Sequence, residues 1–501
     1  MHSYSYKKIS VQFSEVLGRY LVAEKDIFND EVIIEEIPFA LGPKLSSPAI
    51  CLGCYTPVNS EKGGPRCPEC GWPLCGECDS PKEHQAECRI FKEANVRFQN
   101  VPEEHALYFG CAQLDCITPL RVLLKKEADP ERWESEVAPM EYHDKSRREN
   151  KEIWNADLVN VVRYLRGPCK LDRFSEDLIM RVIGILEVNA FEARTSQGYA
   201  IRCLYPITGI LAHSCVPNTT RSIFPTENYR IKLRAMVDIK KGEQLNHSYT
   251  YTLSGTAARQ EHLKSGKYFT CRCKRCSDNT ELGTHFSSFK CNKCDPGLII
   301  TTDPFDLSAE WKCSNCEFKT SGNAIQKAVA VMQAEIDEVQ AMDMNSERLE
   351  NTERLFRKYR SILHPLHFIQ TGLRQSLIEM YGRVEGYEMS ELPDVLLERK
   401  EELCRDVLKV LNVFEPGISR SRAMMLYELH VPIVLTAKTG FQLGLLTGPA
   451  LKKKLQEAVE VLAECANILQ FEDPTTPEGN LAFVALQAME QLKASIQQIE
   501  V

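Results

Sequence analysis

Sixteen cysteine and histidine side chains fall into four groups of four along this chain of 501 residues. Most of them come as Cys-x2-Cys pairs, in which one tight turn presents two sulfur atoms to the same point. Tetrahedral zinc takes four sulfur or imidazole ligands, so the chemistry that this spacing indicates is zinc binding, with four ions per chain. The predicted ligands are Cys51, Cys54, Cys67, Cys70, Cys75, Cys78, His84, Cys88, Cys215, Cys271, Cys273, Cys276, Cys291, Cys294, Cys313 and Cys316.

The first eight ligands are interleaved between residues 51 and 88. We pair 51/54 with 75/78, and 67/70 with 84/88, although spacing alone leaves a sequential pairing open. The closing His-x3-Cys suits one helical turn, which puts both ligands on one face. A module this small has little core of its own, so bound metal would stabilise it. In the third group Cys215 is a distant fourth ligand for the cluster at 271–276, and the fourth group lies at 291–316.

Cysteine usage favours zinc over disulfides. Secreted disulfide domains are usually small and do not carry successive Cys-x2-Cys pairs. Residues 1–8 lack the apolar segment of a signal peptide, and no apolar run reaches the roughly 20 residues that span a bilayer. We therefore expect a cytoplasmic and/or nuclear protein with no membrane segment. Six cysteines have no assigned role: Cys111, Cys116, Cys169, Cys203, Cys404 and Cys465.

Charge says little about the partner. The formal net charge is −8 and the pI about 5.9, so direct nucleic-acid binding is not indicated. A basic protein or peptide substrate is compatible with this balance. The length allows about three domains with several buried cores.

The elements that must position these residues alternate between strand and helix patterns. Strand patterns occupy 18–23, 31–34 and 231–235, the last with alternating apolar and polar residues. Residues 89–185 are mostly helical in pattern. From residue 323 apolar residues recur at helical spacing, with further amphipathic stretches near 352–363, 395–413, 421–436 and 451–471. Pro/Gly breaks such as Glu415-Pro416-Gly417 separate them, which predicts an antiparallel helical array.

A second set of motifs surrounds the third cysteine group. The segment LAHSCVPN at 211–218 is followed by the Gly242-Glu243-Gln244-Leu245 turn, by Ser248-Tyr249 and then by the cysteines from 271, while Gly18-Arg19-Tyr20-Leu21 precedes them all. In this order the chain resembles the SET-and-MYND (SMYD) lysine methyltransferase family over nearly all of residues 9–501. The added Trp311-Lys312-Cys313-x2-Cys316 ribbon resembles the arthropod SmydA branch.

The resemblance implies a zinc-rich α+β fold, in which a MYND zinc finger splits a β-rich SET domain. The implied domains are an N-terminal SET segment (1–50), the MYND finger (51–88), a helical SET insertion (89–185), a core SET domain (186–270), a post-SET zinc cluster and zinc ribbon (271–322), and a helical TPR-like lobe (323–501). The finger spacing departs from the family at Cys75-x2-Cys78, which is one residue short.

The resemblance also implies an activity: transfer of a methyl group from S-adenosylmethionine to a lysine amine of a protein or peptide. Positioning supplies much of the rate of such a displacement, and an apolar channel favours the neutral amine. Tyr249 would be catalytic and orient the amine, and Phe191 would line the substrate channel. The implied cofactor-binding residues are Gly18, Arg19, Tyr20, Asn189, Ala212, His213, Tyr249 and Phe269.

Two departures support a different use of the fold. The family has asparagine where this chain has Ala212, which offers no side-chain hydrogen bond. Its second active-site tyrosine lies four residues before the first post-SET cysteine, where this chain has Lys267; only a one-residue deletion would bring Tyr268 into place. The alternative is a catalytically weak or inactive scaffold, for example a transcriptional corepressor, that binds protein partners through the finger and the helical lobe.

Overall fold

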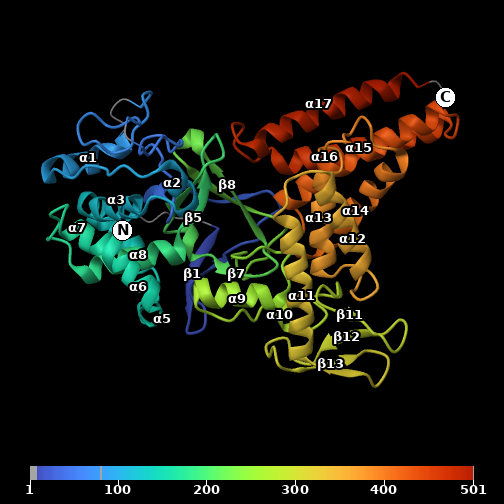
Figure 1. The fold of residues 1–501 in the computed structure, drawn as a ribbon, viewed down its shortest axis with the longest axis horizontal. Coiled ribbons are helices and arrows are strands. Elements are labelled where there is room, and N and C mark those ends of the chain that lie inside the picture. The colour runs from blue at the N-terminus through green and yellow to red at the C-terminus, as the bar shows by residue number, and fades with distance from the viewer. Residues whose placement is uncertain (1–7, 62, 79–81, 500–501) are drawn as a thin grey trace.

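The computed structural model describes residues 8–61, 63–78 and 82–499. The chain before residue 320 forms a body of small sheets and short helices, and the chain after it forms a stack of long helices beside that body (Figure 1). The predicted fold class is confirmed: helices and sheets are mixed, four Cys/His clusters are present, and the C-terminal region is helical. The predicted domain boundaries stay a prediction.

Short strands from both sides of the finger share the same sheets. Strand β3 pairs antiparallel with β9, and β4 pairs with β6, so the chain before residue 50 is hydrogen-bonded to the chain after residue 190. The sheets are ordered β1-β2, β3-β9-β8, β4-β6-β5 and the parallel pair β10-β7. The strands are β1 (Ile9–Ser14), β2 (Gly18–Ala23), β3 (Val32–Glu36), β4 (Ala40–Pro43), β5 (Phe191–Arg194), β6 (Ala200–Leu204), β7 (Ala212–His213), β8 (Thr219–Phe224), β9 (Arg230–Ala235) and β10 (Asn246–His247).

Helices connect the finger to these sheets. Ser175 caps α8 by accepting a hydrogen bond from the Leu178 N–H at 3.2 Å, and this helix ends at Asn189, directly before β5. The α-helices of this half are α1 (Lys82–Ala94), α2 (Glu103–Phe109), α3 (Ile117–Ala128), α4 (Pro130–Arg132), α5 (Asp144–Glu149), α6 (Lys151–Asp157), α7 (Tyr164–Arg166), α8 (Glu176–Asn189), α9 (Thr256–Lys267) and α10 (Lys274–Ser277).

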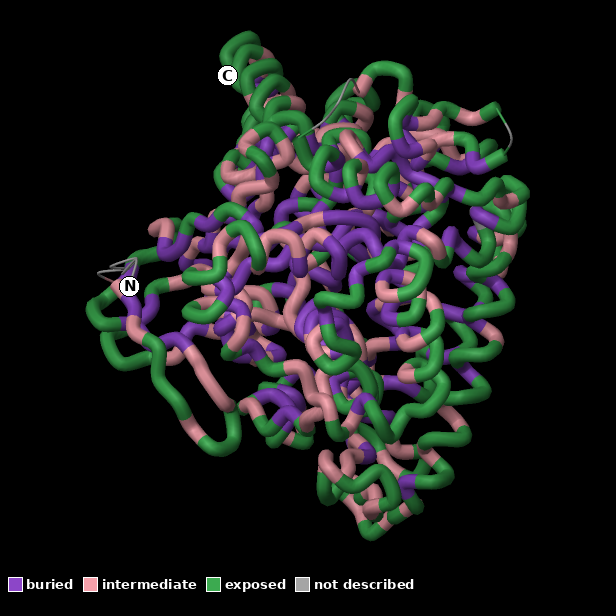
Figure 2. Tube along the Cα trace, turned by 90° about the vertical axis from the view of Figure 1, so that its left-hand side faces the viewer, coloured by how far each residue is buried: buried purple, intermediate pink, exposed green. Residues whose placement is uncertain are grey.

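A four-stranded antiparallel ribbon follows α10, in the order β11-β12-β13-β14. Its strands are β11 (Phe289–Lys290), β12 (Leu298–Thr301), β13 (Glu310–Cys313) and β14 (Lys319–Ser321). The ribbon projects at the bottom of Figure 2, where most residues are only partly buried or exposed. One side chain at its base, Trp311, packs edge-on against Phe289 at 6.0 Å between ring centroids.

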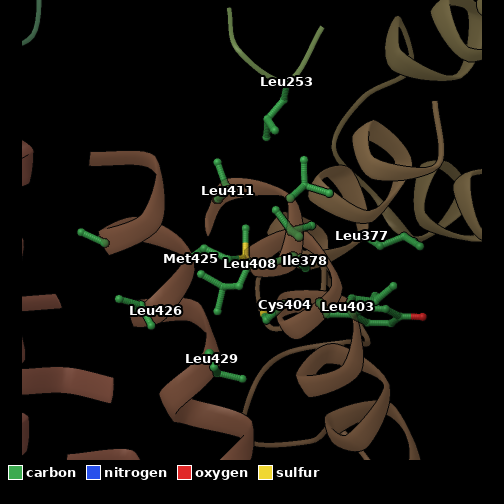
Figure 3. Close-up of a cluster of buried hydrophobic side chains, with 14 of the residues drawn as sticks. Leu253, Leu377, Ile378, Leu403, Cys404, Leu408, Leu411, Met425, Leu426 and Leu429 are labelled. Carbon is green, nitrogen blue, oxygen red and sulfur yellow. The ribbon is translucent and has the colours of Figure 1, made fainter. Parts of the chain in front are cut away.

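Seven helices form the C-terminal lobe and surround one apolar core. Figure 3 shows Leu408 and Leu411 of α14 meeting Met425 and Leu426 of α15, with Leu253 approaching from the loop before α9. The loop before α9 therefore shares a core with these helices, and so do Phe286 and Phe289 further along the chain. The helices are α11 (Gly322–Gln340), α12 (Ser346–Tyr359), α13 (Phe368–Met380), α14 (Asp394–Phe414), α15 (Arg420–Gln442), α16 (Gly448–Leu469) and α17 (Pro477–Gln497). No helix in the described ranges is long and apolar enough to cross a membrane.

The loop between α14 and α15 joins the lobe to the sheets. Gly417 has φ +75°, and a Cβ at this position would lie 1.8 Å from the Met236 carbonyl oxygen. That carbonyl accepts a hydrogen bond from the Ile418 N–H at 3.0 Å. The Pro/Gly break read from the sequence is thus also a point of close contact between the two halves.

Candidate active site and zinc centres

The structure brings together all sixteen predicted zinc ligands. Within each group the ligand atoms lie within 4.8 Å of one another, and Zn–S bonds of 2.3 Å place tetrahedral sulfur ligands about 3.8 Å apart. Measured separations agree: the Sγ atoms of Cys54 and Cys75 are 3.6 Å apart, and those of Cys67 and Cys88 are 3.7 Å apart. The interleaved pairing is therefore the one that forms, and the sequential pairing is excluded. The donor sets fit zinc.

The second finger cluster is fastened to the helical insertion through its histidine. His84 places Nε2 3.3 Å from the Cys70 Sγ and Nδ1 3.0 Å from the Glu87 carboxylate. Glu87 is fully buried and accepts two hydrogen bonds of 2.6 Å from Arg121 of α3. Arg121 also donates to the carbonyls of Leu41 and Leu52. Such a carboxylate–histidine pair fixes the orientation of a metal-binding imidazole.

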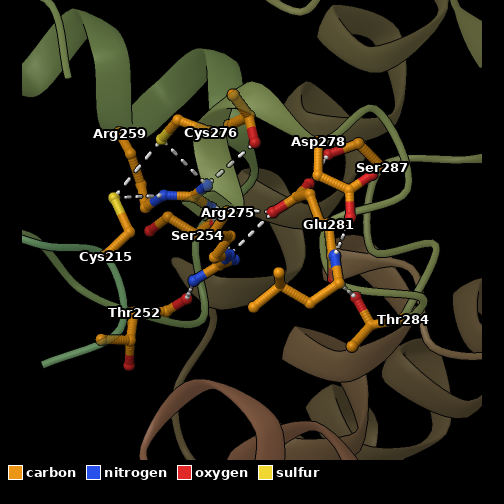
Figure 4. Close-up of polar contacts among 12 residues, drawn as sticks. Cys215, Thr252, Ser254, Arg259, Arg275, Cys276, Asp278, Glu281, Thr284 and Ser287 are labelled. Atoms are coloured by element: carbon orange, nitrogen blue, oxygen red, sulfur yellow. Dashed lines mark hydrogen bonds and ion pairs between the residues drawn. The ribbon is translucent and has the colours of Figure 1, made fainter. Parts of the chain in front are cut away.

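The third cluster has a buried arginine as its neighbour (Figure 4). Arg259 donates from Nε to the Cys215 Sγ at 3.3 Å and from a terminal nitrogen to the Cys276 Sγ at 3.6 Å. Its other terminal nitrogen donates to Glu281 at 3.1 Å and to the Ser254 carbonyl, and Glu281 also pairs with Arg275 at 2.9 Å. Four thiolates around Zn²⁺ carry a net charge of −2, so a guanidinium at this distance stabilises the cluster.

The fourth cluster leaves no room beside its sulfur atoms. A Cβ on Gly297 would lie 2.4 Å from the Cys294 Sγ and 2.6 Å from the Cys313 Sγ. The Gly297 carbonyl accepts a hydrogen bond from the Cys291 N–H at 2.8 Å. The backbone at this glycine therefore closes one side of the site.

A cavity of about 790 Å³ lies between the sheets, α8 and α9. Eight of the nine predicted catalytic, channel and cofactor-binding residues line it, and they come from five separate segments of the chain. The predicted residues lining the cavity are Gly18, Arg19, Asn189, Phe191, Ala212, His213, Tyr249 and Phe269. Tyr20 is not among the lining residues; its hydroxyl donates to Gln12 across the β1–β2 hairpin at 3.2 Å.

Hydrogen bonds join Tyr249 to His213 and hold both residues in place. The Tyr249 N–H donates to His213 Nδ1 at 3.0 Å, and the Tyr249 hydroxyl donates to the Leu211 carbonyl. With Nδ1 accepting, His213 Nε2 carries the proton and donates to the Cys215 Sγ at 3.3 Å. Burial lowers the pKa of His213 to about 4 and raises the pKa of Tyr249 to about 12. Both side chains are therefore neutral near pH 7.

The methionine end of the predicted cofactor would meet Asn189 and Arg19. The Asn189 amide nitrogen donates to the carbonyls of Glu141 and Ile185, at 2.8 and 2.9 Å, which leaves its oxygen free to accept from an ammonium group. Arg19 has no carboxylate partner within the described part of the chain, so its guanidinium is available to a ligand carboxylate. Gly18 has φ +67° and open space on the side where a Cβ would lie, so it opens the turn beside Arg19. These residues fit S-adenosylmethionine.

Phe191 and Phe269 supply apolar surface on two sides of the cavity. Phe191 begins β5 and lies edge-on to Tyr205 at 5.8 Å, and Phe269 lies 5.9 Å from the His213 ring. Ala212 is buried in β7, where it pairs with Asn246 of β10 and contributes no polar side-chain atom. The missing amide is therefore a real gap in the lining.

Seventeen further residues line the cavity and were not assigned from the sequence; Arg221, His247 and Lys267 are three of them that carry side-chain nitrogen. Arg221 places its guanidinium 5.1 Å from the Phe191 ring centroid. Tyr268 does not line the cavity; it has φ +63° at the end of α9, and its ring lies 4.9 Å from that of His143. Lys267 occupies the wall instead, in the place where the family has its second tyrosine. The only sequence signal for this was the four-residue spacing to Cys271.

Comparison with known proteins agrees with this geometry. The SET domain family matches residues 18–250, so this part of the chain is similar to a SET domain. The SET domain-containing protein SmydA-8, isoform A, of Drosophila melanogaster is 31% identical over 321 residues, covering 62% of this chain and 64% of the fly protein. The human protein named Histone-lysine N-methyltransferase SMYD1 is 25% identical over 289 residues, covering 54% and 56%. These matches support the predicted SET-and-MYND family and its SmydA branch.

These matches reach less than two thirds of the relatives' own lengths, 64% and 65% for the two SmydA-8 isoforms. Among solved structures, a chain described as "Crystal structure of the SET domain of LSMT bound to Lysine and AdoHcy" gives a TM-score of 0.27 with 12% identity, covering 100% of this chain and 90% of that one. A score this low adds nothing on fold or chemistry.

Proposed function

We propose that this protein is an S-adenosylmethionine-dependent protein-lysine methyltransferase. One observation carries the proposal: segments as distant as Gly18 and Phe269 converge on one cavity, and eight of the nine residues predicted for catalysis, channel and cofactor binding line it. Several relatives carry methyltransferase names, among them N-lysine methyltransferase SMYD2 of Homo sapiens. The substrate would be a lysine of a histone or another protein.

When bound, S-adenosylmethionine supplies an electrophilic methyl group. The chain's own residues do the rest. Arg19 and the Asn189 oxygen hold opposite charges of the amino-acid end, while Phe269 covers the base. Tyr249 keeps its proton and presents a fixed hydroxyl, because its N–H is bound to His213 and its O–H to Leu211. Phe191 excludes water from the approach of the amine, which favours the neutral nucleophile.

The direct test is cofactor binding followed by transfer. We expect the purified full chain to bind S-adenosylmethionine at micromolar levels by calorimetry, and to transfer radiolabelled methyl groups to members of a panel of nuclear and cytosolic proteins. If the chain binds neither S-adenosylmethionine nor its product and labels no protein, the proposal is wrong.

A weak or inactive scaffold is the second candidate, and Ala212 favours it. Loss of one hydrogen bond costs about 1 kcal/mol, which weakens binding without abolishing it. Ala212→Asn should restore an amide in β7 and tighten S-adenosylmethionine binding about fivefold or more. Equal or weaker binding by the Asn form would remove Ala212 as a reason for low activity.

We also propose that residues 51–88 form a MYND finger that binds a protein partner, and that the protein works in the cytoplasm, the nucleus or both. The two zinc-capable clusters of this segment support the finger. None of the 21 cysteines forms a disulfide, and fifteen lie in zinc-capable clusters, which supports a reducing compartment. Fractionation of cells that produce the protein tests the location. Recovery of the chain only from the culture medium would contradict a cytoplasmic or nuclear location.

A further inference from the structure

Lys267 puts a positive charge into the wall of the cavity, beside Tyr249. It is the last residue of α9, and Tyr268 ends the helix in the left-handed conformation while its N–H donates to the Leu263 carbonyl. The Tyr268 ring lies 4.9 Å from that of His143 and is not itself part of the cavity lining, whereas Lys267 is. The Lys267 Nζ lies 5.5 Å from the Tyr249 ring centroid and donates to the Val188 carbonyl.

No carboxylate neutralises this charge within the described ranges. Three acidic residues line the cavity, and two of them are engaged elsewhere: Glu192 pairs with Lys44, and Glu141 accepts from the His143 N–H at 2.9 Å. The remaining acid, Glu15, forms no ion pair with Lys267. Burial lowers the pKa of Lys267, as expected for an ammonium that lacks a counter-ion. The carbonyl and the aromatic face are what stabilise it.

The proposed cofactor brings a second positive charge to the same place. Methyl transfer beside Tyr249 requires the sulfonium of S-adenosylmethionine to lie near its hydroxyl, whereas the product S-adenosylhomocysteine has a neutral thioether there. The two compounds are otherwise the same in charge, so both would use Arg19, Asn189 and Phe269 alike. A fixed ammonium in this wall repels the sulfonium of S-adenosylmethionine but not the neutral thioether of S-adenosylhomocysteine.

We propose that Lys267 makes the cavity discriminate against the sulfonium, so that the chain binds S-adenosylhomocysteine more tightly than S-adenosylmethionine. This rests on the proposed function. A unit positive charge as far from Lys267 Nζ as the Tyr249 ring, 5.5 Å, would be repelled at an effective dielectric constant of about 20 strongly enough to change affinity about a hundredfold, and about tenfold if water enters. The family's tyrosine at this place would not impose that repulsion.

The test is calorimetric binding of both compounds to the full-length protein and to three variants. Lys267→Met keeps the length and apolar stem of the side chain but removes its charge, and Lys267→Arg keeps the charge. Lys264→Met is the matched control, because Lys264 lies one turn earlier on α9 and is exposed. We expect wild type, Lys267→Arg and Lys264→Met to prefer the product at least tenfold, and Lys267→Met to lose that preference by tightening on S-adenosylmethionine alone.

The outcomes separate this inference from the proposed function. If both compounds bind wild type and the affinity ratio is the same in Lys267→Met, the inference is wrong and the function stands. If neither compound binds wild type, both fail. Melting temperatures of all variants check folding, and Lys267→Gln replaces Lys267→Met if the latter does not fold.

Discussion

At the scale of single residues, hydrogen-bond donors surround the sulfur ligands. The Cys51 Sγ accepts from the backbone N–H groups of Gly53 and Cys75, at 3.4 and 3.2 Å, and the Cys215 Sγ accepts from His213 and Arg259. These donors stabilise thiolate over thiol, which is the form that binds zinc. The sites are therefore shaped for metal by their surroundings as well as by ligand spacing.

Gly297→Ala should cost the chain one zinc ion. The new methyl group would need the space within 2.4 Å of the Cys294 Sγ, which is closer than real Cβ contacts come. We expect four zinc equivalents in wild type and three in the variant by atomic absorption. Gly266→Ala is the control, because a Cβ there meets nothing within 4 Å; equal zinc content in both variants would refute the packing argument.

Tyr249→Phe should reduce methyl transfer about a hundredfold, the order typical of losing one oriented polar contact in a closed site. The ring would still fill its place beside His213, so the thermal midpoint should change little. Radiolabelled transfer and thermal unfolding are measured side by side. Undiminished transfer by the Phe variant would assign the catalytic role to another residue.

Spacing in the sequence predicted the zinc ligands well because Cys-x2-Cys turns are local. It also predicted eight lining residues, through the resemblance. It could not predict Lys267 over Tyr268, because that choice depends on where α9 ends and on the left-handed conformation of one residue. Arg221 and His247 were missed for a related reason: they reach the cavity only through the pairing of β8, β9 and β10 with distant segments.

At the scale of elements, α1 and α3 hold the finger to the body through one buried ion pair. Arg121→Met would leave the buried Glu87 carboxylate without a cationic partner and with only the His84 ring as a hydrogen-bond partner, and breaking such a buried ion pair costs about 3–5 kcal/mol. We expect a lower unfolding midpoint and faster loss of finger zinc to a chromogenic chelator. The helices were anticipated here, but the ion pair was not.

The control for this change is Arg173→Met. Arg173 likewise pairs with a glutamate, Glu127 of α3, at 2.7 Å, but both side chains are nearly half exposed. Loss of this surface ion pair should therefore cost less than about 1 kcal/mol. Similar zinc loss from the two variants would mean that the Glu87–Arg121 pair does not fasten the finger.

Two helices of the C-terminal lobe, α13 and α17, escaped the sequence interpretation. In α17 the buried positions include Gly479, Ala482 and Ala485, while Phe483 and Leu486 are exposed. Small residues let α17 approach α16 closely. The large apolar residues therefore lie on the exposed face of α17, and the amphipathic pattern does not identify its buried face. The N-terminal signal was present, since Thr476 caps the helix and Pro477 follows it.

At the scale of the whole molecule, the α14–α15 loop contacts Met236, the residue that follows β9, and this contact joins the two halves. Gly417→Ala should destabilise the protein by about 1–3 kcal/mol beyond its backbone strain, because the Cβ would collide with the Met236 carbonyl. Gly444→Ala is the matched control: its φ is +72° against +75°, but nothing lies within 4 Å. Equal unfolding free energies for the two variants in urea would contradict the role of this contact.

The long span of the third cluster sets an order of events during synthesis. Cys215 can complete its zinc site only after the other three ligands have left the ribosome. The last of them, Cys276, is 61 positions further along the chain. The His213 ring is hydrogen-bonded to Cys215 and to Tyr249. Until the cluster closes, the first of these two partners is not held in place by metal. A chain that has not bound zinc would thus carry the residues that line the cavity but lack the cluster that fixes one side of it, so zinc supply would limit how many chains form a finished cavity.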